Sequence, residues 1–394
     1  MRAWVLVLAL GGCGFSSAAG PPVGDPSQTP PDASGDAPSG GIDSGVPDAE
    51  VVHLCLGSMI KVCVDAPRTG LSLGGGPLDT TAGAIGSHCL PPTAYTTDPP
   101  IDACVIAAQT LSIPDRNTVA ATGARPLILL AGDALTIAGT LDAASHRGGG
   151  GHTGPAADTG PCPNNMTAPT TAPADQGGQG GGGWGGSFGL GGANGNGTVG
   201  GGTGGIAGSN LIITALGGGC PGGGGANNAL GGGGGSGGHG GGAVVLVAGQ
   251  SITVDGAVNA SGAGGGTGQV RGGGGGGGSG GMIVLDAPTV AINGRCFANG
   301  GGGGQGGNAL AGDSGNESSA PNNAASGGAS PTVGGAGGAG GIASAGALPG
   351  QPGGTNGVDT GGGGAGGGAI GVIKVFASNR RHTSETDHIS PPPS

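Results

Sequence analysis

The sequence predicts an all-β protein, a parallel β-helix-like solenoid of short strands interrupted by long glycine-rich insertions. Three observations predict it. A strand unit recurs from residue 125 onward, apolar residues alternate with small or polar ones inside each unit, and glycine is concentrated between the units. Glycine makes up 108 of the 394 residues, whereas it averages about 7% of protein sequences. With only seven aromatic residues as well, this composition excludes the large apolar core of an ordinary enzyme domain.

The repeated unit occurs in three copies and a final half copy. The copies occupy residues 127–143, 244–260 and 282–298, and the half copy occupies residues 369–377. Each copy is a strand, a turn, a second strand, a glycine turn and a short third strand. Recurrence of such a unit is typical of solenoids.

Alternation inside the unit predicts half-buried strands, because period-2 patterning with β-branched residues places alternate side chains on one face. One unit cannot bury its own apolar face, so the copies are expected to stack as parallel strands. A β-sandwich of the same strands is the alternative. The aligned apolar residues are Leu135, Ile252 and Val290; Ile137, Val254 and Ile292; and Leu141, Val258 and Cys296.

The chain divides into five segments. We expect a lipoprotein signal peptide at 1–12, a tether rich in Pro, Gly, Ser and Asp at 13–50, a cysteine-containing lead-in segment at 51–124, the β-solenoid at 125–378 and a disordered tail at 379–394. The tether has almost no apolar residues and is expected to be flexible. The glycine-rich insertions in the solenoid occupy 147–242, 262–281 and 299–368.

The N-terminus indicates export. Arg2 precedes a short apolar run at 3–10, and Leu10-Gly11-Gly12-Cys13 follows. Small residues after such a run mark a signal peptide, and a cysteine directly behind them resembles the bacterial lipobox, in which Cys13 would be lipidated. An ordinary signal peptide cut at 16–19 is the alternative. Gly14 favours the outer membrane by resemblance to diderm lipoproteins, so we expect a lipid-anchored, extracytoplasmic cell-surface protein.

The cysteines predict disulfides and one buried thiol. In an exported chain, four cysteines within one segment suggest two disulfides. Neighbouring pairs, Cys55 with Cys63 and Cys89 with Cys104, are the local choice, although four cysteines allow three connectivities. Cys296 aligns with core residues and is expected to be a free thiol in the core. Cys162 and Cys220 then remain to pair with each other.

Charge and motifs argue against several functions. The formal net charge of −11 gives no electrostatic footprint for nucleic acid. Ser187, Ser236 and Ser279 fit the G-x-S-x-G pattern, but any serine in a glycine tract does so, and no helix is expected beside them. We predict no catalytic residue, no metal site and no cofactor. His146 and His152 are close in sequence without a third metal ligand. The carboxylates of the strand units, Asp142, Asp255 and Asp286, align with no other acid.

The glycine tracts have two interpretations. Ordering glycine costs more conformational entropy than ordering other residues, which favours loops projecting without order. The other interpretation is polyglycine II, in which extended glycine chains with threefold geometry pack closely and hydrogen-bond to their neighbours. Gly-Gly-x doublets at 333–340 suit that geometry, and the tract at 147–242 is the best candidate because a disulfide could close it.

A resemblance follows from residues 125–129 (RPLIL), 135–142 (LTIAGTLD) and 183–189 (GWGGSFG). Together with the lipobox, they resemble the glycine-rich predicted surface lipoproteins of myxobacteria and related deltaproteobacteria, which are sometimes labelled PE-PGRS-like. The resemblance would cover about residues 50–380 and implies no established activity.

We therefore expect a non-enzymatic, lipid-anchored cell-surface protein with a structural or adhesive role. Its partners would be the membrane, through the N-terminal lipid, and a cell-surface polymer or a neighbouring cell. The alternative is a carbohydrate-binding or carbohydrate-acting β-helix protein. A third hypothesis, an antifreeze role for the glycine tracts, would require flat rows of Thr or Ala.

Overall fold

The computed structural model describes residues 53–81, 88–147, 152–174, 178–210, 212–329, 333–357, 359–382 and 388–394, with His382 described by its backbone alone. All of them belong to one unit, Val51–Ser394. The predicted signal peptide at 1–12, the lipidation site Cys13 and the tether at 13–50 lie outside the described residues and stay predictions.

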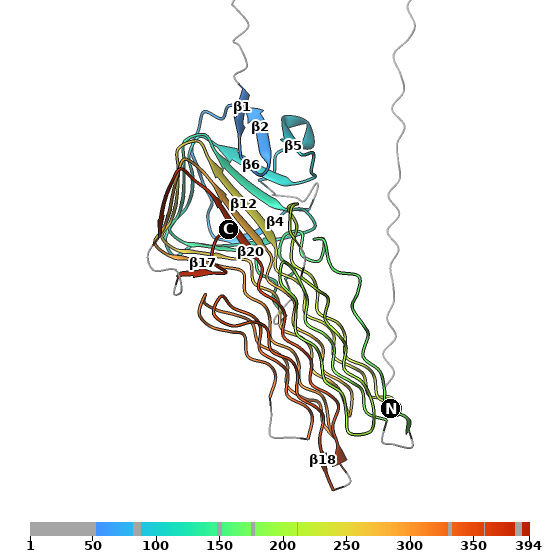
Figure 1. Ribbon diagram of the computed structural model, residues 1–394. Helices are drawn as coiled ribbons and strands as arrows, with labels where there is room; N and C mark the ends of the chain where they lie inside the picture. Colours follow the sequence, from blue (N-terminus) through green and yellow to red (C-terminus); the bar gives the residue numbers. More distant parts are fainter. Residues whose placement is uncertain are drawn as a thin grey trace, which may run out of the picture. The chain divides into compact units, whose positions relative to one another are not determined.

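Most of the strands lie in three parallel sheets, which we number 1 to 3. Successive strands of the chain enter sheet 1, then sheet 2, then sheet 3, and then return to sheet 1. Figure 1 shows the three sheets as the sides of a triangle. Sheet 1 contains β6 (Cys104–Ala108), β9 (Leu127–Ala131), β12 (Ala243–Ala248), β15 (Met282–Asp286) and β20 (Val372–Phe376). Sheet 2 contains β3 (Leu71–Ser72), β7 (Leu111–Ile113), β10 (Ala134–Ile137), β13 (Ser251–Val254), β16 (Thr289–Ile292) and β21 (Asn379–His382). Sheet 3 contains β4 (Gly76–Asp79), β8 (Thr118–Thr122), β11 (Thr140–Asp142), β14 (Ala257–Asn259), β17 (Arg295–Phe297) and β22 (Ile389–Ser390).

The register of the sheets confirms the alignment of the second and third strands of the repeated units. In the first strand, Val244 pairs with Ile283, so the third copy begins one residue later than expected. Leu135 pairs with Ile252, and Ile252 with Val290. Likewise, Val258 lies between Leu141 and Cys296. These side chains are fully buried between the three sheets, as the alternating pattern predicts. The all-β class and the parallel pairing are thus confirmed, and a two-layer sandwich does not describe strands divided among three sheets.

Glycines stack at the corner between sheets 2 and 3. A Cβ atom on Gly256 would lie 1.8 Å from the carbonyl oxygen of Gly139, and a Cβ atom on Gly294 would lie 2.0 Å from that of Gly256. Heavy atoms cannot approach so closely, so the turn between the second and third strands of each copy requires glycine. This agrees with the glycine turn predicted for each copy.

The middle of sheet 1 is buried on both faces, which explains why β9 and β12 are continuous apolar runs. Every residue of β9 and of β12 is buried. The outer side chains, such as Ile128 and Val245, pack with residues of a small antiparallel sheet and with Phe188 and Ile213 of the first glycine-rich insertion. That small sheet contains β1 (His53–Leu56), β2 (Lys61–Asp65) and β5 (Tyr95–Asp98), and the 3-10 turn η1 (Pro92–Ala94) precedes β5.

The predicted boundary at residue 125 does not hold. Residues of the lead-in segment form β3, β4 and β6 to β8, which join the three sheets. Leu111 pairs with Leu135, and Val119 pairs with Leu141. These strands escaped detection because alanine, serine and threonine dilute their apolar pattern.

The predicted disordered tail is also wrong for its described residues. β21 pairs with β16, and β22 pairs with β17, so the last strands complete the sheets. Ile389 is fully buried. Charged residues at Arg380 and Arg381 conceal the strand, because their side chains are exposed at the end of the stack and need no apolar alternation.

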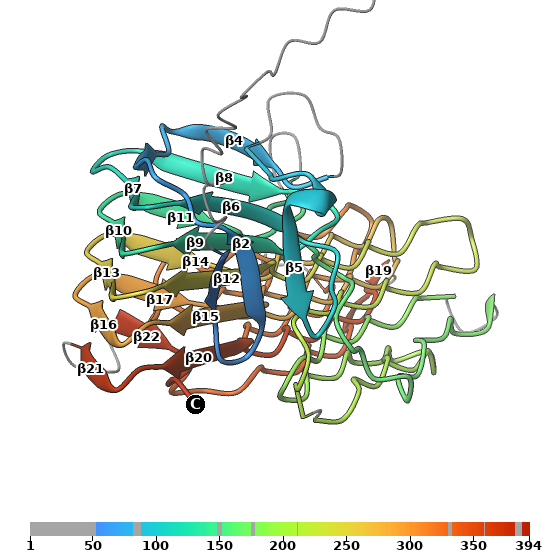
Figure 2. The same ribbon diagram turned by 90° about the horizontal axis from the view of Figure 1, so that it is seen from above.

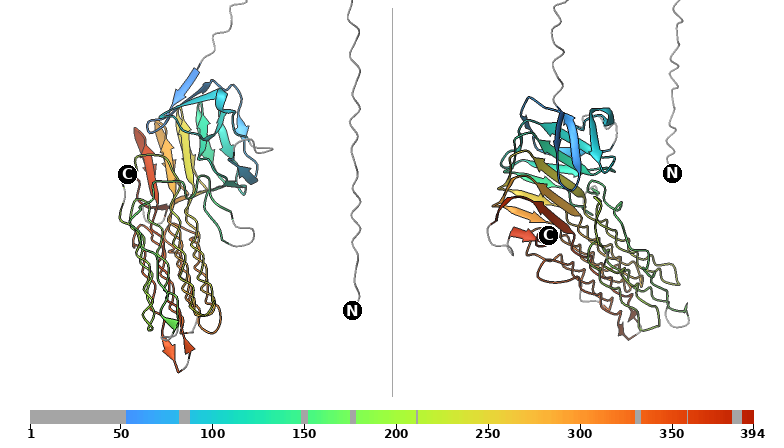
Figure 3. Two further views of the ribbon diagram at one scale, coloured as in Figure 1. Left: turned by 90° about the vertical axis from the view of Figure 1, so that its right-hand side faces the viewer. Right: turned by 45° about the horizontal axis from the view of Figure 1, so that its top comes forward.

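All three glycine-rich insertions leave the strands at one corner. They connect β11 to β12, β14 to β15 and β17 to β20, and each connection runs from sheet 3 to sheet 1. Figures 2 and 3 show the inserted segments side by side in one block beside the sheets. We call the described residues of this block the glycine bundle. They are 152–174, 178–210, 212–242, 260–281, 299–329, 333–357 and 359–371, and they include the hairpin of β18 (Thr355–Asn356) and β19 (Asp359–Thr360).

Segment 272–281 shows how the glycine bundle holds together. It is buried along its whole length. Its successive N–H groups donate to three neighbouring segments in rotation, so each neighbour receives a bond from every third residue. Its carbonyl groups accept bonds from three further segments, containing Gly183, Gly235 and Gly304. The bonds donated run from Gly273 to Ala226, Gly274 to Gly363, Gly275 to Gly266, Gly276 to Gly223, Gly277 to Gly366 and Gly278 to Ala263, with N···O distances of 2.8 to 3.0 Å.

Close approach of the segments requires glycine. A Cβ atom on Gly276 would lie 1.7 Å from the carbonyl oxygen of Trp184. In place of a side-chain core, the interior of the bundle contains backbone whose polar groups bond to neighbouring backbone. Of the two interpretations of the tracts, ordered packing therefore describes these residues.

Candidate functional site

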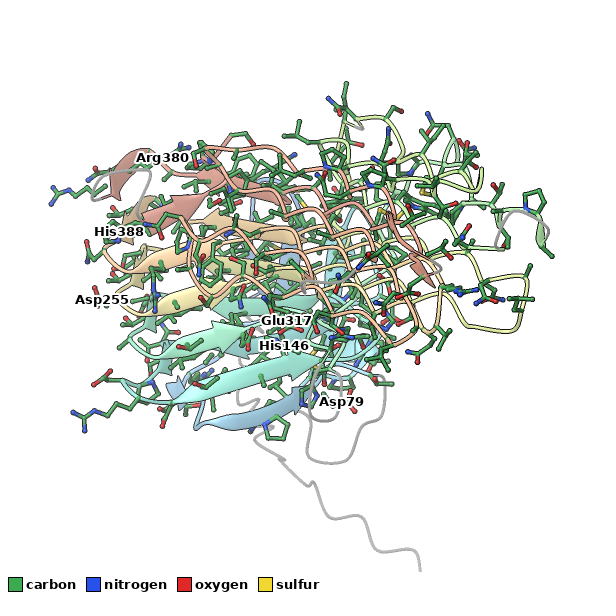
Figure 4. All side chains as sticks on the ribbon, turned by 90° about the horizontal axis from the view of Figure 1, so that it is seen from below. Asp79, His146, Asp255, Glu317, Arg380 and His388 are labelled. Atoms are coloured by element: carbon green, nitrogen blue, oxygen red, sulfur yellow. A yellow bond between two sulfur atoms is a disulfide. The ribbon has the colours of Figure 1, made fainter. Side chains whose placement is uncertain are left out.

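The carboxylates of the strand units do not come together. Asp142 contacts Asn259 and His146, Asp255 accepts a hydrogen bond from Asn293 at 2.8 Å, and Asp286 binds Ser58. Figure 4 shows Asp255 well separated from His146. Glycoside hydrolysis needs two carboxyl groups within about 10 Å across the scissile bond. Each of the three carboxylates instead contacts its own set of side chains.

The serines of the G-x-S-x-G patterns have structural partners. Ser187 is buried, and its hydroxyl donates to the carbonyl of Gly208 and accepts from the N–H of Gly192. Ser279 is fully buried, with its Oγ 2.8 Å from the backbone nitrogen of Cys220. Ser236 is exposed. Each pattern lies in the glycine bundle, whereas a nucleophile elbow requires a turn between a strand and a helix.

His146 lies between two carboxylates. Its Nε2 is 3.0 Å from Oδ2 of Asp142, four residues earlier, and its Nδ1 is 2.6 Å from Oε2 of Glu317 in the third insertion. The other oxygen of Glu317 accepts the N–H of Arg147. Figure 4 shows His146 and Glu317 next to each other. The contacts tie sheet 3 to the glycine bundle.

The electrostatics of this cluster favour the charged forms. Hydrogen bonds to Asp142 and then to Glu317 raise the pKa of His146 to about 10, although burial opposes the change. Burial would raise the pKa of Glu317, but the hydrogen bonds from His146 and from the N–H of Arg147 outweigh it, so that pKa is lowered. A protonated imidazole between two carboxylates is a structural ion cluster at neutral pH.

A second histidine makes a similar contact. Nδ1 of His239 lies 2.6 Å from Oδ2 of Asp158, and the other carboxylate oxygen accepts the N–H of Gly240. The hydrogen bond to Asp158 raises the pKa of His239. His152 meets His146 through a backbone hydrogen bond alone. Within the described ranges, no group of three or more His, Cys, Asp or Glu side chains could hold a metal ion.

The cysteines pair as the sequence predicts. Disulfides join Cys55 to Cys63, Cys89 to Cys104 and Cys162 to Cys220. Cys296 is a free thiol buried between the three sheets. Burial raises its pKa to about 12, so the thiol is not a reactive nucleophile at neutral pH.

The end of the glycine bundle away from the sheets is the most distinctive surface. Some segments of the bundle are joined directly to strands of the sheets, for example 232–242 to β12 and 260–269 to β14. One end of each of these segments lies at the sheets for that reason. The turns at their other ends therefore gather at one end, where β18 also lies in Figure 1. We call four of them the distal turns: 198–201, 228–231, 269–272 and 308–311.

Each distal turn exposes one aliphatic side chain. The exposed fractions are 68% for Val199, 67% for Leu230, 46% for Val270 and 71% for Leu310. Four other large apolar side chains of the glycine bundle are also exposed, but none of them lies in a distal turn: Leu190, Ile206, Ile212 and Leu348. Two of the turns share the sequence Asn-Ala-Leu, at 228–230 and 308–310.

Hydrogen bonds hold the distal turns in place. The side-chain oxygen of Asn228 accepts the N–H of Leu230 at 2.5 Å, and that of Asn308 accepts the N–H of Leu310 at 2.8 Å. Asn228 also donates to the carbonyl of Val270. The N–H of Arg271 then donates to the carbonyl of Asn308 at 2.8 Å. Three of the distal turns are thus directly linked.

The distal turns are not among the sites predicted from the sequence. A usable signal existed: an isolated Leu or Val between glycines, twice preceded by Asn-Ala. Such a residue has no periodic partner along the chain, so neither helical nor strand patterning detects it.

In the part of the chain that the structure describes, no helix is both long enough and apolar enough to cross a membrane. Compared with protein-family models, with curated proteins and with solved structures, the chain gives no match. The resemblance to surface lipoproteins therefore stays an expectation from the sequence.

Proposed function

We propose that the three sheets are the faces of a parallel β-helix-like solenoid, and that the glycine bundle is a polyglycine II structure. The fixed order in which strands enter the sheets supports the first assignment. Bonds from every third residue to the same neighbour support the second, because an extended helix with three residues per turn presents its N–H groups in that way.

We further propose a non-enzymatic, lipid-anchored protein of the outer membrane and cell surface, with a structural or adhesive role. One observation carries the proposal: the glycine bundle is an internally hydrogen-bonded projection whose far end exposes aliphatic side chains. A projection of this kind suits contact with another surface. The separate partners of the strand carboxylates and the burial of Ser187 and Ser279 support the non-enzymatic part.

Export is supported by the disulfides. Structural disulfides persist in oxidising compartments and are rare in the bacterial cytoplasm. The three disulfides join segments within the small antiparallel sheet, at the edge of sheet 1 and within the first insertion. They agree with the signal sequence and lipobox, in which Cys13 would receive the lipid.

Fractionation of cells that produce the full chain tests this proposal. We expect the chain in the outer-membrane fraction, open to protease added outside the cell, and its Cys13→Ser variant released from the membrane. The matched control is Cys296→Ser, which removes a cysteine without touching the lipobox. A chain found in the cytoplasm with reduced cysteines would overturn the proposal.

Carbohydrate binding is a second candidate, favoured by one groove at the corner between sheets 2 and 3. It has a volume of about 420 Å³. Hydroxyl and charged groups line it, including Thr118, Thr140, Asp255 and Arg295. Affinity electrophoresis in acidic and neutral polysaccharides tests it, with Arg295→Ala expected to remove any retardation that the unmodified chain shows.

A further inference from the structure

Each distal turn holds a large aliphatic side chain that is exposed to solvent. Val199, Leu230, Val270 and Leu310 are each about half exposed or more. The other residues of the four turns are Gly, Ala, Thr, Asn, Gln and Arg. Burying an aliphatic side chain stabilises a contact in proportion to the apolar area removed from water. Four such side chains lie at one end, three of them in turns that are hydrogen-bonded to one another, and they form a surface that is suited to an apolar partner.

The form of this surface argues against a protein partner. A stable protein interface needs about 800 Å² of complementary surface on each side. The four aliphatic side chains lie on four separate turns and are each only partly exposed, so they do not by themselves make a surface of that size. Side chains that project from separate turns instead suit a partner that can deform around each of them. The interior of a lipid layer deforms in this way.

Charge further narrows the partner. Within the distal turns, Arg271 is the one charged side chain. Asp313, two residues beyond the last turn, is exposed, and Asp359 of β19 is half-buried. The chain as a whole has a net charge of −11, so an anionic lipid surface would repel it. A layer of zwitterionic lipids lets the aliphatic side chains enter and leaves Arg271 at the depth of the lipid phosphates.

We propose that the distal turns form a lipid-contacting end of the glycine bundle, which inserts Val199, Leu230, Val270 and Leu310 into a zwitterionic lipid surface. The proposal deepens the adhesive role proposed above and rests on it for the cellular setting alone. The contact itself follows from exposed aliphatic side chains and does not depend on lipidation at Cys13.

Flotation with vesicles of phosphatidylcholine tests the proposal. The protein is the chain from residue 13 onward with Cys13→Ser, so that no attached lipid contributes. The distal variant combines Val199→Thr, Leu230→Gln, Val270→Thr and Leu310→Gln. The control variant makes the same types of change at exposed apolar residues elsewhere in the bundle: Leu190→Gln, Ile206→Thr, Ile212→Thr and Leu348→Gln.

We expect the parent chain and the control variant to float with the vesicles, and the distal variant to partition at least about tenfold more weakly. Replacing a third of the lipid with phosphatidylserine should weaken the parent's binding. Equal partitioning of the two variants, or no binding by the parent, would overturn the proposal. A distal variant that still floats with vesicles but no longer attaches to whole cells would also overturn the proposal. That result would assign the distal turns to a protein or glycan partner.

Failure here is distinct from failure of the proposed function. The fractionation experiment depends on Cys13 and the flotation experiment does not. Circular dichroism and thermal unfolding of both variants check that the bundle stays folded, which we expect because every substituted residue is exposed.

Discussion

Nδ1 of His146 lies 2.6 Å from Oε2 of Glu317, 171 residues further along the chain. The contact joins the end of sheet 3 to the third insertion and therefore ties the strands to the glycine bundle. Because Asp142 holds the other ring nitrogen, a single imidazole bridges two carboxylates.

The stability of the protein should fall as pH rises from about 6.5 to about 10. The folded-state pKa of His146 is raised from 6.5 to about 10, so its contribution is complete below the lower value and is lost as pH approaches the upper one. Glu317 acts at the acid side: its pKa is lowered from 4.5, so its contribution is lost as pH falls through the folded-state value. Urea unfolding at a series of pH values measures both slopes.

Substitution of His146 isolates the alkaline slope. His146→Gln should reduce the free energy of unfolding by about 2 kcal/mol at pH 6, the range for hydrogen bonds to charged groups. It should also flatten the decline between pH 6.5 and pH 10. His152→Gln is the control, because the exposed ring of His152 has no such partners. Parallel curves for His146→Gln and the unmodified chain would show that the cluster does not control this slope.

The interior of the glycine bundle should not accept a methyl group. Gly276→Ala would place Cβ 1.7 Å from the carbonyl oxygen of Trp184, so we expect a loss of about 3 kcal/mol or more. Gly224→Ala is the matched control, because its Cβ would meet nothing closer than 3.5 Å. Thermal unfolding should distinguish the two, and equal stability would mean that the segments are not packed at backbone contact.

The disulfide of the first insertion should stabilise the bundle selectively. Cys162 and Cys220 are 58 residues apart, and closing a loop of that length contributes about 4 kcal/mol in the chain-entropy account. The double variant Cys162→Ser, Cys220→Ser should lose protection against hydrogen exchange in the bundle and keep it in the sheets. The control, Cys55→Ser with Cys63→Ser, opens a β-hairpin instead. Unchanged protection of the bundle in the first variant would contradict the expectation.

Cys296 should be chemically silent in the folded protein. Burial raises its pKa to about 12, so very little of the reactive thiolate form is present at pH 8. Iodoacetamide should label it only in denaturant. Cys296→Ala should cost about 1 kcal/mol, because it leaves a small cavity between the sheets. Labelling of the folded chain at the rate of a free thiol would show that the core opens.

Much of the body could be predicted because its units repeat. Ile252 occupies the same position as Leu135, so the alignment of two stretches of sequence already gives their spatial pairing. Strands β3, β4 and β6 to β8 join the same sheets in register, but alanine, serine and threonine dilute their apolar pattern. Neighbouring strands provide much of the burial of these strands, so this burial cannot be recognised from their own sequence.

The candidate sites were harder to predict for two physical reasons. His146 and Glu317 meet through the fold, and no local pattern connects residues so far apart. At Leu230 and Leu310, the information lies in which end of the bundle a turn occupies. That depends on where each insertion rejoins a strand, which becomes visible only when the segments are placed in three dimensions.

The common corner at which the insertions leave the sheets restricts how such a protein can change in length. A chain that departs from sheet 3 and must return to sheet 1 at the same corner makes each outward pass with a matching inward pass. The bundle can therefore lengthen a tract or gain a pair of passes without altering the strands. A single unpaired pass would leave the chain at the end of the bundle away from the sheets, where it could not continue into sheet 1. Relatives with larger or smaller bundles should therefore differ by whole pairs of outward and inward passes.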